Sequence, residues 1–183
     1  MIDPDSWVAE NLLDPRGAVR LNESGKVSAG PVVWRKLHVG ILDNGKANAR
    51  FLLDEARAAL AAANTELTFT VIRKPTASLP AAADVMARLV QECDVVVTGT
   101  GDCGSCTAWT VRDTIELESR GIPAVMFVSD KFVPLAEALF DEANLEAKIV
   151  VGEHPFGGRS EGEARVIGRG MAARVLEVVG KVS

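Results

Sequence analysis

Short apolar runs alternate regularly with amphipathic segments from Lys36 to near the end of the chain. Each run is followed by glycine, asparagine, aspartate or proline, a pattern typical of buried strands that end in turns. The segments between them place apolar residues three and four positions apart, which predicts helices. The predicted strands are residues 37–42, 67–72, 94–98, 124–128 and 148–151. The predicted helices are residues 48–63, 81–92, about 108–120, 133–142 and about 161–179.

Strands that alternate with helices in this way predict a parallel sheet with helices on both faces. Right-handed crossovers then leave few topologies. We therefore expect a three-layer α/β/α fold with a five-stranded parallel sheet in the flavodoxin-like order 2-1-3-4-5. No internal repeat, second core or low-complexity linker interrupts residues 35–183, which we expect to form a single α/β domain.

Residues 1–34 do not follow this alternation. They predict a short helix at 7–12, a turn at 14–17 and a short strand at 18–21, which together would form an N-terminal arm or hairpin. Trp7 and Trp34 would anchor this arm on the body of the protein or on another subunit. We therefore expect a homo-oligomer, or a hetero-oligomer with a related subunit.

Composition argues against several classes of function. The 183 residues carry a net charge of −5 and only 5% aromatic residues, with no tyrosine, so a nucleic-acid-binding face is not expected. No apolar run approaches the roughly 20 residues of a membrane span, and the N-terminus lacks the pattern of a secretory leader. Three cysteines, an odd number, do not make a disulfide framework. We expect a cytoplasmic protein that acts on a small molecule, with no membrane partner.

Two cysteines stand where the third predicted strand gives way to a helix, in the stretch TGTGDCGSCT at residues 98–107. Its glycines and polar residues indicate an exposed turn. A thiol at a helix N-terminus lies near the positive end of the helix dipole, which favours the thiolate. The spacing of Cys103 and Cys106 places both sulfurs on one helix face, one turn apart. This is the geometry of a redox dithiol, and the alternative is that both cysteines serve as small buried hydrophobes.

Other candidates follow neighbouring strands. In open parallel sheets, ligands bind beyond the carboxyl ends of the strands, where the strand order switches between strands one and three. Asn44, Gly45 and Lys46 follow strand one, Lys74 follows strand two and His154 follows strand five. A lysine there would hold a substrate carboxylate or lower a thiol pKa, and a histidine would exchange protons. The alternatives are ordinary surface lysines and a histidine that ties down a turn.

The glycines at 99, 101 and 104 would offer backbone N–H groups to a phosphate or a carboxylate, although they lack the spacing of a dinucleotide or P-loop motif. Cys93 precedes strand three at the opposite edge of the sheet, and His38 lies inside strand one, so we expect both to be structural. The predicted catalytic residues are Cys103, Cys106, Asp102 and His154. The predicted substrate-binding residues are Asn44, Gly45, Lys46, Lys74, Thr100, Gly101, Gly104, Ser105 and Thr107. We predict no metal site and no cofactor.

The stretch GDCGSCT at residues 101–107 closely resembles the UGSC family of (seleno)proteins. These proteins are named for a selenocysteine-Gly-Ser-Cys motif that is often replaced by Cys-Gly-Ser-Cys. Cys103 occupies the selenocysteine position. The resemblance covers most of residues 37–179 and includes ILDNGK at 41–46, RKP at 73–75 and EHPFGG at 153–158.

The UGSC family is similar in turn to the selenoprotein B components of glycine, sarcosine and betaine reductases. This resemblance implies a redox or covalent role for residue 103, with Cys106 resolving a bond to it. The chain departs from the reductases at Trp109, where they carry a further cysteine, and it has sulfur in place of selenium. These departures argue against a reductive cleavage of the glycine-reductase type.

Our first hypothesis is a thiol-dependent oxidoreductase or reductase subunit. Cys103, activated by Asp102 or the helix dipole, would attack a small carboxylated or sulfur-containing substrate. Cys106 would then displace the adduct by forming a disulfide, which an external thiol or a reductase partner would reduce. One alternative is a metal-binding or redox-sensing dithiol protein with His154 as a third ligand.

Two further alternatives have less support from the residues. A cofactor-free, thiol-based racemase or lyase would normally place its two cysteines on separate loops, whereas Cys103 and Cys106 are adjacent in the chain. Flavin binding is suggested only by analogy with the expected fold.

Overall fold

The computed structural model describes residues 36–146 and 148–179. It contains a sheet of five strands, β1 (His38–Asp43), β2 (Thr68–Arg73), β3 (Val95–Gly101), β4 (Ala124–Ser129) and β5 (Ile149–Gly152). All neighbouring strands are parallel, in the order β2-β1-β3-β4-β5. The predicted strand order is therefore confirmed. The arm or hairpin predicted for residues 1–34 lies outside the described residues.

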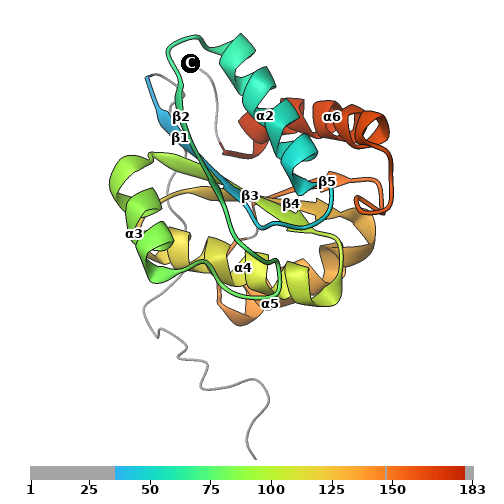
Figure 1. Ribbon diagram of the computed structural model, residues 1–183. Coiled ribbons are helices and arrows are strands. Elements are labelled where there is room, and N and C mark those ends of the chain that lie inside the picture. The colour runs from blue at the N-terminus through green and yellow to red at the C-terminus, as the bar shows by residue number, and fades with distance from the viewer. Residues whose placement is uncertain (1–35, 147, 180–183) are drawn as a thin grey trace, which may run out of the picture.

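Helices cover both faces of the sheet (Figure 1). Helices α2 (Ala49–Ala63) and α6 (Glu161–Val179) lie side by side on one face. Helices α3 (Ala83–Glu92), α4 (Gly104–Ser119) and α5 (Val133–Glu142) lie on the other, with a short 3₁₀ turn, η1 (Asp130–Phe132), before α5. Within the described residues, no helix combines the length and the apolar character that crossing a membrane requires.

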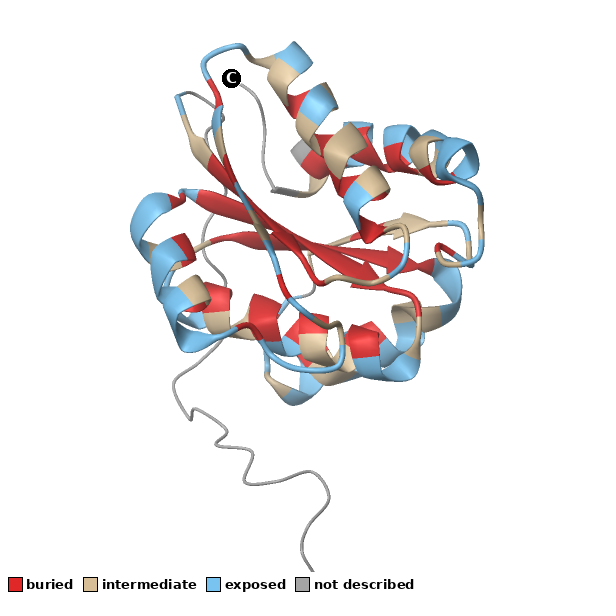
Figure 2. Ribbon diagram, in the orientation of Figure 1, coloured by how far each residue is buried: buried red, intermediate tan, exposed pale blue. Residues whose placement is uncertain are grey.

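The central strands β3 and β4 form the middle of the core, and every one of their residues is buried (Figure 2). A first apolar layer lies between the sheet and helices α2 and α6, and it includes Leu52, Leu60, Val97 and Phe156. A second layer, on the opposite face, consists of two apolar clusters, one that includes residues of α3 and one that includes residues of α5. It includes Leu42, Met86, Leu89, Met126 and Phe140. Burial on both faces explains why β4 is apolar from Ala124 to Val128 and why β3 begins with three valines.

The third strand ends at Gly101, beyond the predicted end at Thr98. The glycines here are strand residues in tight packing, and they do not form the exposed turn that the composition suggested. Gly99 pairs with Phe127 of β4, and a Cβ added at Gly99 would lie 3.3 Å from the Leu53 side chain. A Cβ at Gly101 would lie 2.6 Å from Met126 Cε. A side chain at either position would therefore require its neighbours in the packed layers to shift.

Helix α4 begins at Gly104, earlier than the predicted start near residue 108, because Cys103 caps it. Helix α3 begins at Ala83 instead of residue 81. The N–H of Ala81 donates to the Asp113 carboxylate at 2.8 Å, so the chain before α3 is attached to α4 and is not yet helical.

The loops at the carboxyl ends of the strands are joined by side-chain hydrogen bonds. Asn48, just before α2, donates from Nδ2 to the carbonyl oxygens of Phe156 and Arg159 at 2.8 and 3.0 Å. Asn44 donates from Nδ2 to the carbonyl oxygen of Thr100 at 2.8 Å. Segments that are about 110 residues apart in sequence are thus fixed against one another at the edge of the sheet where the cysteine motif lies.

Candidate functional site

Cys103 and Cys106 form a close pair at the junction of β3 and α4. Cys103 is the N-cap of α4 and is partly exposed, whereas Cys106 lies in the first turn of the helix and is 1% exposed. Their sulfur atoms are 2.7 Å apart. The backbone N–H of Cys106 donates to Cys103 Sγ at 3.4 Å, and the N–H of Asp102 donates to Cys106 Sγ at 3.2 Å. One thiol therefore faces outward and the other lies behind it.

The two thiols differ in acidity. Burial opposes ionisation of Cys103, but hydrogen bonds from the Cys106 side chain and backbone and from the Ser105 hydroxyl, together with the charge of Lys46, outweigh it and lower the pKa of Cys103. Burial raises the pKa of Cys106 to about 11, and its hydrogen bond to Cys103 acts in the same direction. Cys103 is therefore the thiol that ionises first, with Cys106 as the neutral donor beside it.

The loop after β1 places one cation near these sulfurs. Asn44 is 1% exposed, its Nδ2 also donates to Thr110 Oγ1 at 2.9 Å, and its Oδ1 accepts the N–H of Lys46 at 3.1 Å. Its side chain therefore supports the loop and is not open to a substrate. Gly45 has a φ of 78°, and a Cβ there would lie 2.7 Å from the carbonyl oxygen of Lys74. Lys46 is partly exposed, and its charge favours ionisation of both thiols.

Lys74 lies in the interior. Its side chain is 1% exposed, and its ammonium group forms an ion pair with Asp113 of α4, whose side chain is 2% exposed. Asp113 also accepts the N–H of Ala81, so a single carboxylate joins the loop after β2 to α4. Lys74 is thus neither a surface lysine nor an open cation at the edge of the sheet.

The Asp102 carboxylate is fully engaged with the loop after β5. Its Oδ1 accepts the N–H of Phe156 at 2.9 Å and lies 3.0 Å from His154 Nδ1, and its Oδ2 accepts the N–H of Gly157 at 2.9 Å. The side chain is 3% exposed. The Asp102 carboxylate therefore holds the loop of His154 against the cysteine turn. The backbone N–H of Asp102 at the same time donates to Cys106 Sγ.

The remaining predicted residues are distributed over the same junction. Gly104 and Ser105 are exposed in the first turn of α4, and Ser105 Oγ lies 3.8 Å from Cys103 Sγ. Thr100 and Thr107 are fully buried, and each has an Oγ1 atom without a hydrogen-bond partner among the described residues. Gly101 lies beside Thr107 inside the fold. The exposed part of the junction is therefore formed by Cys103, Gly104 and Ser105.

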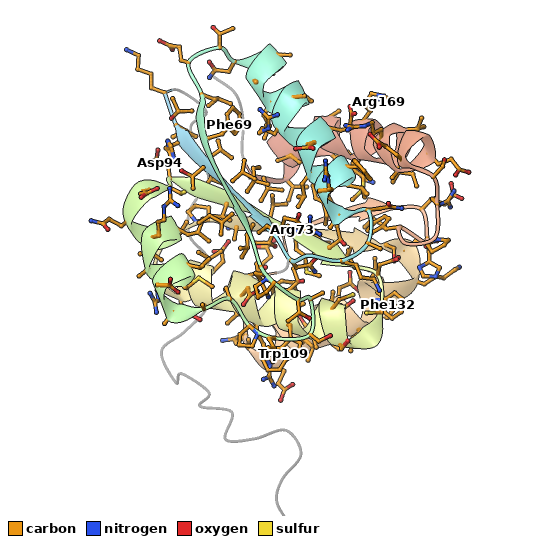
Figure 3. All side chains as sticks on the ribbon, in the orientation of Figure 1. Phe69, Arg73, Asp94, Trp109, Phe132 and Arg169 are labelled. Carbon is orange, nitrogen blue, oxygen red and sulfur yellow. The ribbon has the colours of Figure 1, made fainter. Side chains whose placement is uncertain are left out.

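Sequence reasoning did not single out Asp113, and it included Phe156 only as part of the EHPFGG stretch. Ser129 ends β4 and lies 3.1 Å from His154 Nδ1, and Phe156 is a core residue whose N–H binds Asp102. Asp113 could have been noticed as a charged residue on the apolar face of the predicted helix. Trp109, at the position of the reductases' further cysteine, is partly exposed on the side of α4 that faces away from the sheet (Figure 3).

No group of three or more His, Cys, Asp or Glu residues within 36–146 and 148–179 is arranged to hold a metal ion. The Nδ1 atom of His154 faces Asp102 and Ser129.

The family assignment follows from a match to the UGSC family model over residues 11–181. The chain belongs to the UGSC family. The match begins inside residues 1–34, so part of the N-terminal segment is included in what this UGSC protein shares with its family.

Comparison with solved structures finds proteins similar in fold to this UGSC protein. A diflavin flavoprotein A3 from Nostoc sp. is 11% identical and has a TM-score of 0.45. The matched region covers 77% of this chain and 92% of the flavoprotein chain. A flavodoxin-like domain from Synechococcus sp. is 8% identical and has a TM-score of 0.39. The matched region covers 76% of this chain and 99% of that domain. None of the curated proteins compared matches the sequence.

Proposed function

We propose that this UGSC protein is a thiol-dependent oxidoreductase, or the catalytic subunit of a reductase, with Cys103 as nucleophile and Cys106 as resolving thiol. The substrate would be a small carboxylated or sulfur-containing molecule, and an external thiol or a reductase partner would restore the dithiol. The observation that carries the proposal is the asymmetry of the pair. The outer thiol has a lowered pKa, while its neighbour 2.7 Å away remains protonated at neutral pH.

This asymmetry suits a two-step exchange with a disulfide R–S–S–R′. The Cys103 thiolate forms a bond to one substrate sulfur, the S–S bond breaks, and R′S⁻ leaves and takes up a proton. Cys106 then loses its proton, attacks Cys103 Sγ and releases the second thiolate. The dithiol gives two electrons to the substrate and becomes the Cys103–Cys106 disulfide. An external dithiol reverses that oxidation by the same exchange.

Lys46 supports the carboxylate part of the proposal. It carries a positive charge near Cys103, and no ion-pair partner is found for it among the described residues. A partly exposed ammonium group in this position would attract a substrate carboxylate while it favours the thiolate. Lys74 does not share this role, because Asp113 neutralises it in the interior.

The proposal is tested by alkylating the reduced native protein with iodoacetamide at neutral pH and following each cysteine by peptide mass analysis. Cys103 should react well before Cys93, because burial raises the pKa of Cys93 to about 11. Equal labelling of these two cysteines would contradict the proposal.

A trapping experiment then tests the resolving step. With a small disulfide, Cys106→Ser should accumulate a mixed disulfide on Cys103, whereas the unmodified protein should proceed to the internal disulfide. Cys103→Ser should do neither. If Cys106→Ser fails to retain an adduct while Cys93→Ser retains one, the assigned roles are wrong.

A further inference from the structure

His154 is held in one orientation by contacts on three sides. Its Nδ1 lies 3.0 Å from Asp102 Oδ1 and 3.1 Å from Ser129 Oγ. Its backbone N–H donates to Asp130 at 3.1 Å, and its ring packs against Phe132 at 5.7 Å between centroids. Figure 3 labels Phe132, which extends from η1 beside α5. The imidazole therefore has little freedom to rotate.

These contacts select a tautomer. An ionised carboxylate accepts hydrogen bonds only, so the nitrogen that faces Asp102 carries the hydrogen. In the neutral ring, Nε2 is then the atom with the free lone pair, and in the charged ring it is the atom that gives up its proton to a substrate. The His154 side chain is 32% exposed, whereas those of its two partners are buried. The imidazole is thus partly accessible, whereas the groups that hold it are not.

Asp102 connects this histidine to the dithiol. Its carboxylate contacts His154 and its backbone N–H donates to Cys106 Sγ. A single residue therefore fixes the position of the ring relative to the sulfur pair. Ser129 ends the neighbouring strand β4, is fully buried, and contributes the second contact to Nδ1.

We propose that His154, positioned by Asp102 and Ser129, donates the Nε2 proton to the thiolate that leaves the substrate, so that the site takes aliphatic disulfides and related sulfur compounds with a basic leaving group. This inference rests on the proposed function. As Cys103 bonds to one sulfur and the S–S bond breaks, the departing R′S⁻ takes the Nε2 proton and becomes R′SH. His154 becomes neutral and is protonated again by solvent. Asp102 and Ser129 act through His154 and are positioning residues.

The test compares two uncharged reagents, bis(hydroxyethyl) disulfide and bis(4-nitrophenyl) disulfide. The aliphatic thiolate is a strong base and needs the proton, whereas the nitrophenyl thiolate is a weak base and does not. General acid catalysis of this kind is typically worth on the order of 100-fold or more. His154→Gln should therefore slow the aliphatic reaction at least about tenfold more than the aromatic one. Ser129→Ala should shift the same ratio in the same direction by less.

The matched control is His38→Gln, because His38 binds Thr68 and Thr70 at the other end of β1. This variant should leave the ratio unchanged. An unchanged ratio in His154→Gln, with both reactions lost in Cys103→Ser, overturns the inference and leaves the proposed function standing. Reaction of both reagents with Cys103→Ser at the normal rate overturns the proposed function as well.

A second measurement does not depend on activity. Nitrogen-15 NMR of the unmodified protein should show neutral His154 with hydrogen on Nδ1 and not on Nε2, which is the reverse of the form favoured in water. Ser129→Ala should increase the Nε2–H form. A neutral ring with hydrogen on Nε2 in the unmodified protein overturns the inference, whatever the kinetics show.

Discussion

The sulfur of Cys103 accepts the backbone N–H of Cys106 at 3.4 Å, so the outer cysteine caps the helix that carries the inner one. The same sulfur lies 2.7 Å from Cys106 Sγ. A negative charge on Cys103 therefore has two donors from one residue and lies at the positive end of the helix dipole. The acidity of the outer thiol depends on its inner neighbour more than on the carboxylate of Asp102.

This dependence predicts that Cys106→Ala raises the pKa of Cys103. The substitution removes the S–H donor and leaves the backbone N–H in place. A hydrogen bond to a charged group is worth about 1.5–3 kcal/mol, which corresponds to a shift on the order of one to two pKa units. Cys106→Ser, which keeps a donor, should cause a smaller rise. The rate of alkylation of Cys103 as a function of pH measures the shift, and an unchanged or lower pKa in Cys106→Ala would contradict this account.

Cys93 predicts a loss of stability at alkaline pH. Burial raises its pKa to about 11 from an ordinary value of 9.0. Because the folded pKa is the higher one, the stability that the neutral thiol contributes is complete below about pH 9 and is lost as the pH rises through about 11. A difference of about two units corresponds to about 2–3 kcal/mol.

The variant Cys93→Ala should therefore be less stable at neutral pH but should lose less stability between pH 9 and pH 11. Urea unfolding of the reduced protein at several pH values measures this. The chain has no tyrosine, so no phenol titrates in the same range. Parallel curves for Cys93→Ala and the unmodified protein would refute the prediction.

The sequence was informative about this fold where one physical signal was dominant. Doubly buried strands such as β3 and β4 begin with apolar runs, so the strands could be located from the alternation and their order inferred from the handedness of crossovers. The cysteine pair could be placed at the carboxyl edge for the same reason. His154 could be placed at that edge, but its contacts with Asp102 and Ser129 could not be foreseen.

Other features depend on contacts between distant residues. Gly99 and Gly101 have the composition of a turn, yet they are strand residues that pair with β4, and a side chain at either position would crowd Leu53 or Met126. Lys74 looked like a loop lysine because its partner, Asp113, is 39 residues away. Pairing of that kind leaves no local pattern, so only the three-dimensional structure identifies it.

Lys46 predicts an electrostatic contribution to reactivity. Lys46→Gln should raise the pKa of Cys103 modestly and slow its reaction with a dicarboxylate disulfide more than with an uncharged one, because the variant loses both thiolate stabilisation and anion attraction. The preference of the unmodified protein for the anionic reagent should also weaken as salt is added. The matched control is Lys36→Gln, whose lysine is paired with Glu66 near the start of β1. Equal effects of the two substitutions on the rate ratio would exclude a role for Lys46.

The buried pair of Lys74 and Asp113 predicts a large loss of stability when only one partner is removed. Lys74→Met leaves the Asp113 carboxylate buried without its cation, which typically costs about 3–5 kcal/mol. The double variant Lys74→Met/Asp113→Asn should lose less than the sum of the two single variants, because the amide still accepts the N–H of Ala81. Chemical unfolding of all four proteins provides the cycle. Additive losses, or a Lys74→Met protein as stable as the original, would show that the pair is not coupled.

Two glycines, one just before the cysteine motif and one inside it, predict opposite responses to the same substitution. In Gly101→Ala the new methyl group would lie 2.6 Å from Met126 Cε and 3.0 Å from Thr107 Oγ1, inside a packed layer. Overpacking of this kind costs about 1–3 kcal/mol. In Gly104→Ala the methyl group would meet no atom within 4 Å at the start of α4, and the variant should gain up to about 1 kcal/mol because the unfolded chain loses freedom. Urea unfolding of both variants gives the comparison, and Met126→Ala should relieve the loss in Gly101→Ala if crowding is its cause. Equal effects at the two positions would mean that β3 does not continue to Gly101 in the tightly packed form described.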